Sequence, residues 1–356
     1  MEQNRNNILE EDIGKLLESN LDFELLNNKT VLITGATGLI GSFLIKALLK
    51  LNHEKNTNIH LCALVRDTAK AKTIFGSAAE RAELELLEAD ILEELSYPGT
   101  IDYMIHGASV TDSASFVQKP VETIEVTLAG LKHVLELAKI KRVKSFVYLS
   151  SMEVYGVTDE TLTSVTERDY GYLDPLEVRS SYSEGKRMAE CLCCAYAKEY
   201  QMNIKIARLV QTFGAGVRYE DNRVFAQFAR AVIEERDIVL HTKGETIRSY
   251  CYISDAAEGI LYVLLKGENG QAYNVANTEA TLSICQMARM LAERYTKTNV
   301  RIEESDIQRF GYNPVVKMKM DTSKIQTLGW MPSVEIEEAF ERLIASMCLE
   351  KDRSNE

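Results

Sequence analysis

The sequence predicts an α/β protein whose main part is a doubly wound parallel sheet and whose C-terminal part is a smaller mixed lobe. Two observations support this prediction. Between residues 29 and 212, short apolar runs alternate with longer segments of helical composition, and a glycine-rich turn follows the first run. Alternating strands and helices form parallel sheets with right-handed crossovers. After about residue 212 the alternation loosens, which indicates a substrate-binding lobe interleaved with the last strands.

The individual elements follow from residue type and length. Short runs of apolar, β-branched or aromatic residues predict strands at 31–35, 59–65, 84–88, 101–106, 145–150 and 204–209. Segments rich in Ala, Leu, Lys and Glu predict helices, notably at 121–139 and 183–200. The expected domains are a helical extension over 1–28, a Rossmann-like dinucleotide-binding domain over 29–212, and the substrate-binding lobe over 213–350.

The turn after the first strand has the composition of a phosphate-binding loop. Its sequence is Thr34-Gly35-Ala36-Thr37-Gly38-Leu39-Ile40-Gly41. The first glycine permits a tight turn, the second lets the backbone approach a pyrophosphate, and the third lets the helix pack on the strand. The helix that follows offers unpaired N–H groups and the positive end of its dipole to phosphates. This strand–turn–helix context predicts a bound dinucleotide.

Small and polar residues also follow the later strands. They are Asp90 after the third strand, Gly107, Ala108 and Ser109 after the fourth, and Ser150 and Ser151 after the fifth. Ligands of doubly wound sheets bind beyond the carboxyl ends of the strands. We therefore expect these residues and the glycine turn to share one site.

Tyr182 and Lys186 are the candidate reacting pair. They lie four residues apart in a segment of helical composition, so both side chains project from the same helical face. An ammonium group beside a phenol favours the ionised phenolate. On this interpretation Lys186 lowers the pKa of Tyr182 and turns it into an acid or base that works near neutral pH.

Composition excludes several classes of function. The net charge of −12 argues against a nucleic-acid-binding surface. No apolar stretch reaches membrane-spanning length and residues 1–28 are polar and charged, so we expect a cytoplasmic protein with no membrane partner. Cys191, Cys193 and Cys194 have no nearby histidine, which favours small hydrophobic side chains over a metal site.

With these residues in view, the chain resembles the extended short-chain dehydrogenase/reductases of the epimerase/dehydratase type, which modify nucleotide sugars. The resemblance covers about residues 29–345. It rests on Thr34–Gly41, Ser150-Ser-Met-Glu-Val-Tyr-Gly156, Tyr182-x-x-x-Lys186 and Arg248-Ser-Tyr-Cys-Tyr-Ile-Ser-Asp255. Residues 178–190, 221–225 and 246–255 are locally most similar to UDP-glucuronate decarboxylases. The resemblance implies a nucleotide-diphosphate sugar as substrate and a role in polysaccharide biosynthesis.

The resemblance also implies roles for individual residues. Tyr182 would be the catalytic base, Lys186 would lower its pKa and bind the nicotinamide ribose, and Ser151 would hydrogen-bond the sugar oxygen that is oxidised. Asp90 and Ile91 would face the adenine.

For the substrate, the resemblance implies that Arg248 grips the diphosphate and that Arg223 and Lys317 support it. Two departures from the family pattern lie near the sugar: Gln211 and Thr127 stand where the family has asparagines. Both retain hydrogen-bonding ability with altered reach.

Met152 and Glu153 do not decide which reaction follows the oxidation of C4. Related dehydratases have an aspartic acid at the position of Met152, and a thioether cannot donate a proton. Dehydration is therefore disfavoured, and epimerisation and decarboxylation remain. Glu153 either serves chemistry beyond C4 inversion or hydrogen-bonds a sugar hydroxyl.

The cofactor is expected to be NAD, with NADP as the alternative. Enzymes of this fold that use NAD usually carry an acidic residue at the end of the second strand. Here that position is Val65, followed by Arg66 and Asp67. Arg66 suits the 2′-phosphate of NADP, whereas Asp67 suits the ribose of NAD if the loop bends back.

The sequence leaves one further alternative for the activity. A net NADPH-dependent carbonyl reductase would also use Tyr182 and Lys186. The resemblance also implies an oligomeric state: members of the resembled family commonly form homodimers through the helices at 121–139 and 183–200, so we expect a homodimer here.

Overall fold

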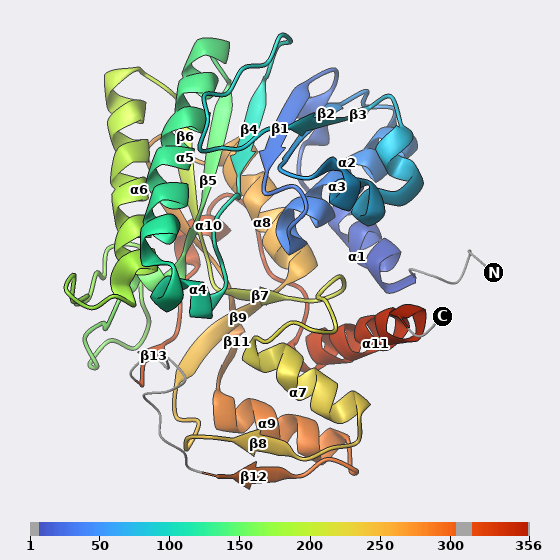
Figure 1. The fold of residues 1–356 in the computed structure, drawn as a ribbon, viewed down its shortest axis with the longest axis vertical. Helices are drawn as coiled ribbons and strands as arrows, with labels where there is room; N and C mark the ends of the chain where they lie inside the picture. The colour runs from blue at the N-terminus through green and yellow to red at the C-terminus, as the bar shows by residue number, and fades with distance from the viewer. Residues whose placement is uncertain (1–6, 304–314, 355–356) are drawn as a thin grey trace.

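The main body of the computed structural model is one parallel sheet, within described residues 7–303 and 315–354 (Figure 1). The sheet has seven strands in the order β10-β6-β5-β4-β1-β2-β3, and each neighbouring pair is parallel. The chain builds β1 to β3 outward on one side and then crosses back to build β4 to β6 on the other. The doubly wound fold class predicted from the sequence is confirmed.

The strands lie close to their predicted positions. They are β1 (Thr30–Thr34), β2 (His60–Val65), β3 (Leu84–Glu88), β4 (Tyr103–His106), β5 (Ser145–Ser151), β6 (Ile204–Leu209) and β10 (Ala272–Val275). β1, β4, β5 and β6 are buried along almost their whole length, because helices cover both faces of the sheet. The seventh strand, β10, comes from the C-terminal part of the chain and pairs with β6.

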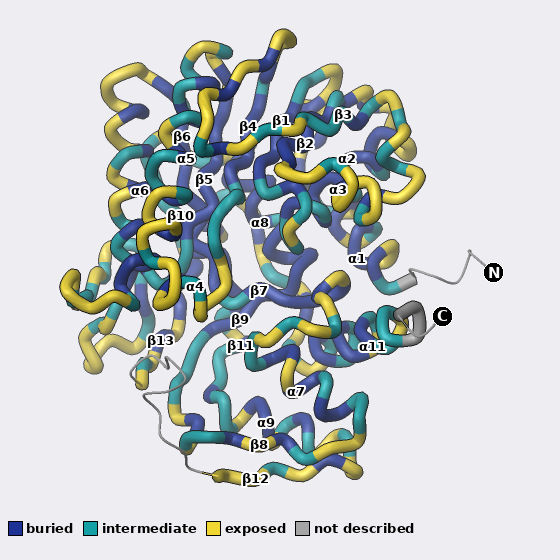
Figure 2. Tube along the Cα trace, in the orientation of Figure 1, coloured by how far each residue is buried: buried dark blue, intermediate teal, exposed yellow. Residues whose placement is uncertain are grey.

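Two helical layers enclose this sheet. The helices of the main body are α1 (Asn7–Leu17), α2 (Leu39–Lys55), α3 (Thr68–Phe75), α4 (Ser113–Gln118), α5 (Pro120–Lys141), α6 (Ser180–Glu199) and α8 (Ile253–Lys266). α1, α2 and α8 share one apolar core with Ile33 of β1, whereas α5 and α6 share a second with Leu32. Alternate residues of a strand point to opposite faces, so the two cores lie on the two sides of the sheet. Figure 2 shows the buried strands between these layers.

The C-terminal lobe lies below the carboxyl ends of the strands in Figure 1. One small sheet contains β7 (Gln211–Phe213), β9 (Ile247–Tyr252), β11 (Asn277–Ser283) and β13 (Lys317–Met318), and β8 (Ile238–Leu240) pairs with β12 (Val300–Ile302). The helices of the lobe are α7 (Val224–Ile233), α9 (Ile284–Arg294) and α11 (Ile336–Ser354). The short α10 (Ser323–Gln326) lies beside β10 of the main sheet. Asp255 at the start of α8 is buried and accepts hydrogen bonds from Ser333 Oγ and the Val334 N–H, both at 3.0 Å. These bonds hold the segment before α11 against the main body.

The N-terminal extension is part of the packed structure. Asp12 of α1 is fully buried; Tyr252 Oη donates to it at 2.7 Å and Arg342 Nε at 2.8 Å. Tyr252 Oη in turn accepts the backbone N–H of Ala215 at 3.3 Å. Asp12 therefore joins α1 to α11 and to the loop that begins at Gly214. Residues 1–6 of the predicted extension lie outside the described residues.

Among the helices of the described ranges, none is both long enough and apolar enough to cross a bilayer.

Candidate active site

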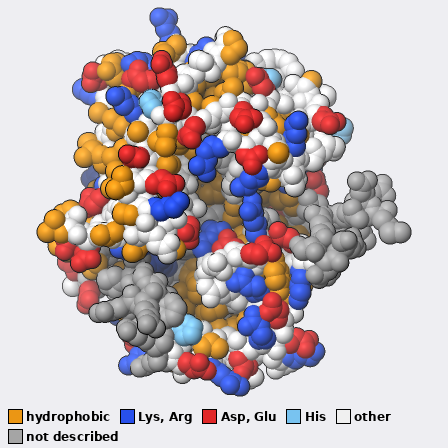
Figure 3. Space-filling view, viewed as in Figure 1, with side chains coloured by type: hydrophobic (Ala, Val, Ile, Leu, Met, Phe, Trp, Pro, Cys, Tyr) orange, Lys and Arg blue, Asp and Glu red, His pale blue; other side chains and the backbone are white. Residues whose placement is uncertain are grey.

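A cavity of about 1040 Å³ opens at the carboxyl ends of the parallel strands. Figure 3 shows a hollow near the middle of the corresponding face, with Lys and Arg side chains along its rim. The cavity is lined by Gly35, Thr37, Gly38, Leu39, Ile40, Gly41, Arg66, Asp90, Ile91, Gly107, Ala108, Ser109, Ser151, Met152, Glu153, Tyr182, Lys186, Gln211 and Arg223, all singled out from the sequence. The parallel strands bring these residues together, since their carboxyl ends meet at one edge.

Two predicted substrate residues do not line this cavity. Arg248 lies on β9 between β11 and β13, and its Nε is buried without a hydrogen-bond partner. Lys317 is exposed on β13. Arg248 thus contributes nothing to the cavity wall, although β9, which carries it, pairs with β7, whose Gln211 does line the cavity. The roles predicted for both residues stay predictions.

The glycine turn has the geometry that its sequence indicates. Gly35 has a φ of +68°, which favours glycine, and a Cβ there would lie 2.7 Å from the backbone of Gly107. A Cβ on Gly41 would lie 2.3 Å from the carbonyl oxygen of Gly35. Gly38 is the N-cap of α2 and contributes no side-chain hydrogen bond to the first turn. The N–H groups at the start of α2 are therefore left for a ligand in the cavity.

A buried polar contact fixes the two strand ends beside this turn. The Thr34 hydroxyl and His106 Nδ1 are 2.7 Å apart, and the Thr34 hydroxyl also accepts the N–H of Ala108 at 3.1 Å. Burial and the nearby Lys186 lower the pKa of His106 to about 3. The imidazole is thus neutral at physiological pH, and its contacts hold β1 and β4 together where Gly107 and Ala108 enter the cavity wall.

Tyr182 and Lys186 lie on consecutive turns of α6, which begins at Ser180, three residues before the predicted start. Both side chains are buried. Lys186 Nζ donates to the carbonyl oxygen of Leu149 at 2.8 Å and lies 5.7 Å from the centre of the Tyr182 ring. The pair thus faces the end of β5, where Ser151 also lines the cavity.

The expected direction of the Tyr182 pKa is wrong in this geometry. Burial raises the pKa of Tyr182, the Glu153 carboxylate raises it further, and Ser151 and Arg179 only partly oppose these effects. Burial also lowers the pKa of Lys186 to about 8. Removing each group from water disfavours its charged form, and this desolvation is the largest cause of both shifts.

Glu153 is held as one member of an ion pair. Arg179 donates to both of its carboxylate oxygens, at 3.1 and 3.0 Å, and Ser183 Oγ donates to one of them at 3.0 Å. A bidentate arginine–carboxylate pair is strong and directional. Glu153 is therefore fixed in place as an acceptor of hydrogen bonds from Arg179 and Ser183.

An aromatic stack connects this ion pair to Tyr182. The ring of Phe116 in α4 lies parallel to the ring of Tyr182, with centroids 4.2 Å apart and planes 10° apart. The guanidinium carbon of Arg179 lies 4.8 Å from the centre of the Phe116 ring. Arg179, Ser183 and Phe116 were not predicted from the sequence. Arg179 and Ser183 were detectable in principle, because Arg179 is the N-cap of α6 and Ser183 directly follows Tyr182.

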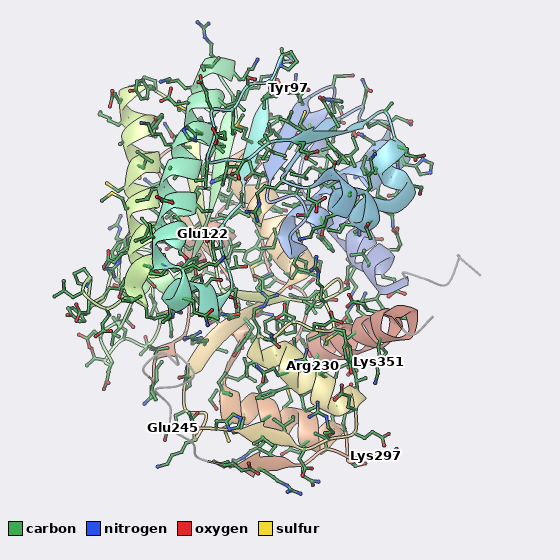
Figure 4. All side chains as sticks on the ribbon, viewed as in Figure 1. Tyr97, Glu122, Arg230, Glu245, Lys297 and Lys351 are labelled. Atoms are coloured by element: carbon green, nitrogen blue, oxygen red, sulfur yellow. The ribbon has the colours of Figure 1, made fainter. Side chains whose placement is uncertain are left out.

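Tight contacts also hold the lower wall of the cavity. Arg223 Nη2 donates to Asp221 at 2.6 Å, and both residues line the cavity. Arg230, labelled on α7 in Figure 4, donates to the carbonyl oxygens of Tyr219 and Asp221. Glu122, labelled at the start of α5, lines the opposite side. The loop that carries Arg223 is thus fixed by α7, and Arg223 is already paired with a carboxylate.

The three clustered cysteines separate as the helical pattern predicts. Cys193 is buried, whereas Cys191 and Cys194 are exposed on α6. Their side chains therefore do not converge on one point.

The fold and cavity define an oxidoreductase-type dinucleotide site, and the residues present fit NAD. The uncapped start of α2 and the glycine turn suit a pyrophosphate, and Tyr182, Lys186 and Ser151 line the same cavity further along. The model of the NAD dependent epimerase/dehydratase family matches residues 31–276. The chain belongs to this family, and NAD is its cofactor.

Sequence relatives and solved structures agree with this assignment. UDP-glucuronic acid decarboxylase 6 of Arabidopsis thaliana is 31% identical over 88% of this chain and 87% of its own length. UDP-glucuronic acid decarboxylase 1 of Xenopus tropicalis is 28% identical over 89% of this chain and 72% of its own.

Two solved structures share the fold. A dTDP-glucose 4,6-dehydratase from Streptomyces venezuelae, with NAD bound, superposes with a TM-score of 0.76 at 20% identity, over 91% of this chain and 98% of that one. A UDP-glucuronic acid 4-epimerase from Bacillus cereus gives 0.72 at 23% identity, over 90% of this chain and 99% of that one.

Replacing Tyr182 by Phe tests the assignment of the base. The variant removes only the hydroxyl, so we expect turnover to fall about a thousandfold or more while NAD binds as before. Turnover and calorimetric binding of NAD measure the two effects. Tyr172→Phe is the matched control, since Tyr172 is exposed and outside the cavity. Wild-type turnover in Tyr182→Phe would show that another group is the base.

The pKa of Lys186 predicts the alkaline side of the pH profile. Its folded-state pKa of about 8 lies below the usual value, so the ammonium form is present below pH 8 and is lost above it. Because that charge favours ionisation of Tyr182, we expect kcat to fall about tenfold per pH unit above about pH 8. A kcat that stays constant from about pH 7 to 10, with the fold intact by circular dichroism, contradicts this role.

Proposed function

We propose that this protein is a UDP-glucuronate decarboxylase, which oxidises C4 of the sugar and then releases its carboxyl group as carbon dioxide. The observation that supports this most is the combination of overall similarity and one retained residue. The similarity to a curated UDP-glucuronic acid decarboxylase extends over 88% of the chain. Glu153, the glutamate shared with that group, lines the cavity beside Tyr182.

The first step follows from the position of Tyr182. As phenolate, Tyr182 takes the proton of the C4 hydroxyl, and Ser151 hydrogen-bonds the same oxygen. When bound, NAD supplies the hydride acceptor and a positive nicotinamide ring. Burial has raised the pKa of Tyr182, so its phenolate is a strong base once formed. The sugar leaves this step as a 4-keto uronate.

The second step needs little from the protein. The C4 ketone lies β to the carboxylate, so the bond between C5 and C6 can break with its electron pair moving toward the ketone oxygen. Carbon dioxide leaves, and C5 then takes a proton. When bound, the cofactor would return the hydride to C4, and Tyr182 would return its proton to the C4 oxygen, so that the net change is the loss of one carbon dioxide. Lys186 and Ser151 stabilise the charge that develops at the ketone oxygen.

The Arg179–Glu153 pair supplies a fixed charged surface at the sugar end of the cavity. Arg179 is half-buried, and one face of its guanidinium covers Phe116. Arg179 and Ser183 donate three hydrogen bonds to the Glu153 carboxylate, which retains acceptor capacity for a further donor. We propose that Glu153 accepts a hydrogen bond from a sugar hydroxyl and so fixes the ring for loss of the carboxylate.

Met152 favours a second candidate, C4 epimerisation without loss of carbon. Met152 is buried, lines the cavity and offers no proton. Epimerisation needs no donor there, because hydride only has to return to the other face of the ketone. The same property counts against dehydration, in which a leaving hydroxyl must be protonated.

A substrate panel tests these alternatives. The protein is incubated with UDP-glucuronate, UDP-glucose, dTDP-glucose and GDP-mannose, and products are weighed by mass spectrometry. We expect UDP-glucuronate alone to lose the mass of one carbon dioxide, and Tyr182→Phe to abolish the loss. An isomer of unchanged mass would favour the epimerase, loss of water from any sugar would favour a dehydratase, and no product from UDP-glucuronate would overturn the proposal.

We also propose that the protein works as a homodimer built on α5 and α6. An apolar hollow between these helices is lined by Leu128, Ala129, Lys132, Met188, Cys191, Leu192 and Ala195. Met188 is 56% exposed, and Val121 and Ile124 on α5 are exposed as well. A contiguous apolar surface of this kind is typical of a protein–protein contact.

The dimer is tested by adding charge to this surface. Met188→Glu should convert dimers to monomers in multi-angle light scattering, because an unpaired carboxylate would be buried at the contact. Lys198→Glu changes an exposed residue near the end of the same helix and should leave the mass unchanged. A wild-type protein that is monomeric at micromolar concentration would contradict the proposal. The cytoplasmic location expected from the sequence stays a prediction.

A further inference from the structure

Four side chains with metal-binding chemistry meet near the amino ends of β2 and β3. His60 and Cys62 lie two residues apart on β2, so their side chains point to the same face of the sheet. Cys62 pairs with Glu85 of β3 in the parallel register, which brings the Glu85 carboxylate to that face. Tyr97, from the segment between β3 and β4, reaches the same carboxylate. These four residues are called the edge cluster, because β3 is the last strand of the sheet.

The polar atoms of the edge cluster converge on one oxygen of Glu85. This atom, Oε2, lies 3.1 Å from His60 Nε2, 4.0 Å from Cys62 Sγ and 2.9 Å from Tyr97 Oη. The ligand atoms of His60, Cys62 and Glu85 all lie within 4.8 Å of one another. Around a tetrahedral zinc ion with bonds of about 2.0–2.3 Å, ligand atoms are about 3.3–3.7 Å apart. Small shifts of these three side chains therefore bring them to one ion.

The edge cluster is open to water on one side and closed by apolar packing on the other. The side chains of His60 and Glu85 are 38% and 44% exposed. Cys62 is buried and belongs with Tyr97 to the apolar core on that side of the sheet. An ion can thus reach the imidazole and the carboxylate from solvent, and the thiol closes the site from within.

The charges of the edge cluster also favour a cation. Within residues 7–303 and 315–354, Glu85 forms an ion pair with His60 and with no Lys or Arg. Lys141 Nζ lies 6.0 Å from the centre of the Tyr97 ring, so it approaches the ring and not the carboxylate. When a metal binds, the Cys62 thiol releases its proton to solvent. The thiolate and the Glu85 carboxylate then balance the two positive charges of a divalent ion.

We propose that His60, Cys62 and Glu85 bind one zinc ion, and that Tyr97 holds the Glu85 carboxylate in place. Sulfur, imidazole and carboxylate together suit Zn²⁺, whereas Ca²⁺ and Mg²⁺ take oxygen ligands. Three protein ligands leave the fourth position to water. A hydrogen bond from a neighbouring side chain to a ligating carboxylate is typical of metal sites, and the Tyr97 hydroxyl supplies it.

The zinc site is separate from the cavity described above. None of its four residues lines that cavity, which lies at the opposite, carboxyl ends of the strands. Figure 4 labels Tyr97 at the end of the molecule away from the C-terminal lobe. Metal binding at the edge cluster therefore does not depend on which sugar reaction the protein performs.

Cobalt tests the site, because the absorption of bound Co²⁺ reports its ligands. The untagged full chain is freed of metal with a chelator, dialysed and titrated with Co²⁺ while its absorption is recorded. We expect one Co²⁺ per chain and a thiolate-to-cobalt charge-transfer band in the near ultraviolet. Zinc should displace the cobalt, since N/O/S sites bind Zn²⁺ more tightly than Co²⁺. Mg²⁺ at millimolar concentration should not displace it.

Single substitutions locate the ion. Cys62→Ser should remove the charge-transfer band, and Cys193→Ser is the matched control, since Cys193 is a buried thiol on α6. Glu85→Gln should weaken Co²⁺ binding about tenfold or more. Glu88→Gln, at the other end of the same strand, should bind as the wild type does. Circular dichroism checks the fold of each variant, and Glu85 is exposed enough that its substitution leaves the core intact.

The zinc site is overturned by any of three results. The wild-type chain gives no charge-transfer band at millimolar Co²⁺, Cys62→Ser keeps the band, or Glu85→Gln binds Co²⁺ with unchanged affinity. Each result would mean that the edge cluster is a hydrogen-bonded contact between β2, β3 and the Tyr97 segment. Missing product from UDP-glucuronate would instead concern the cavity and would leave the cobalt titration as measured.

Discussion

The parallel hydrogen bonding of β1, β4, β5 and β6 is the constraint on which the site depends. Because parallel strands end at one edge, it brings Gly35, Gly107, Ser151 and the helix start after β1 to a single cavity. The Thr34–His106 contact fixes the register at that edge, and the neutral imidazole adds no charge where a dinucleotide must bind. Without this alignment, residues more than a hundred positions apart in the chain would not meet.

Desolvation sets the electrostatics inside the cavity. It raises the pKa of Tyr182, lowers that of Lys186 and makes each charge depend on its neighbours. Arg179 holds Glu153 in a bidentate pair, and the ring of Phe116 stacks on the ring of Tyr182. Burial and the neighbouring Glu153 both raise the pKa of Tyr182, so its hydroxyl is neutral in the absence of ligands.

The two ends of the cavity differ in how their charges are used. On the side of Glu153, Arg179 and Arg223 are each paired with a carboxylate. On the side of β2, Asp67 caps α3 by accepting the backbone N–H of Lys70 at 2.9 Å.

The sequence by itself determined the alternation of strands and helices, the glycine turn and the Tyr182–Lys186 spacing, because these depend on local periodicity and on backbone freedom. Tertiary structure decided the rest. The direction in which the pKa of Tyr182 shifts depends on its burial against α4. The pairing of Glu153 depends on Arg179, which precedes a helix that begins at Ser180. The position of Arg248 outside the cavity wall depends on the placement of β9. These features depend on contacts between segments that are distant in the chain. A local sequence pattern predicts neither how far such contacts bury a side chain nor which residue becomes its partner.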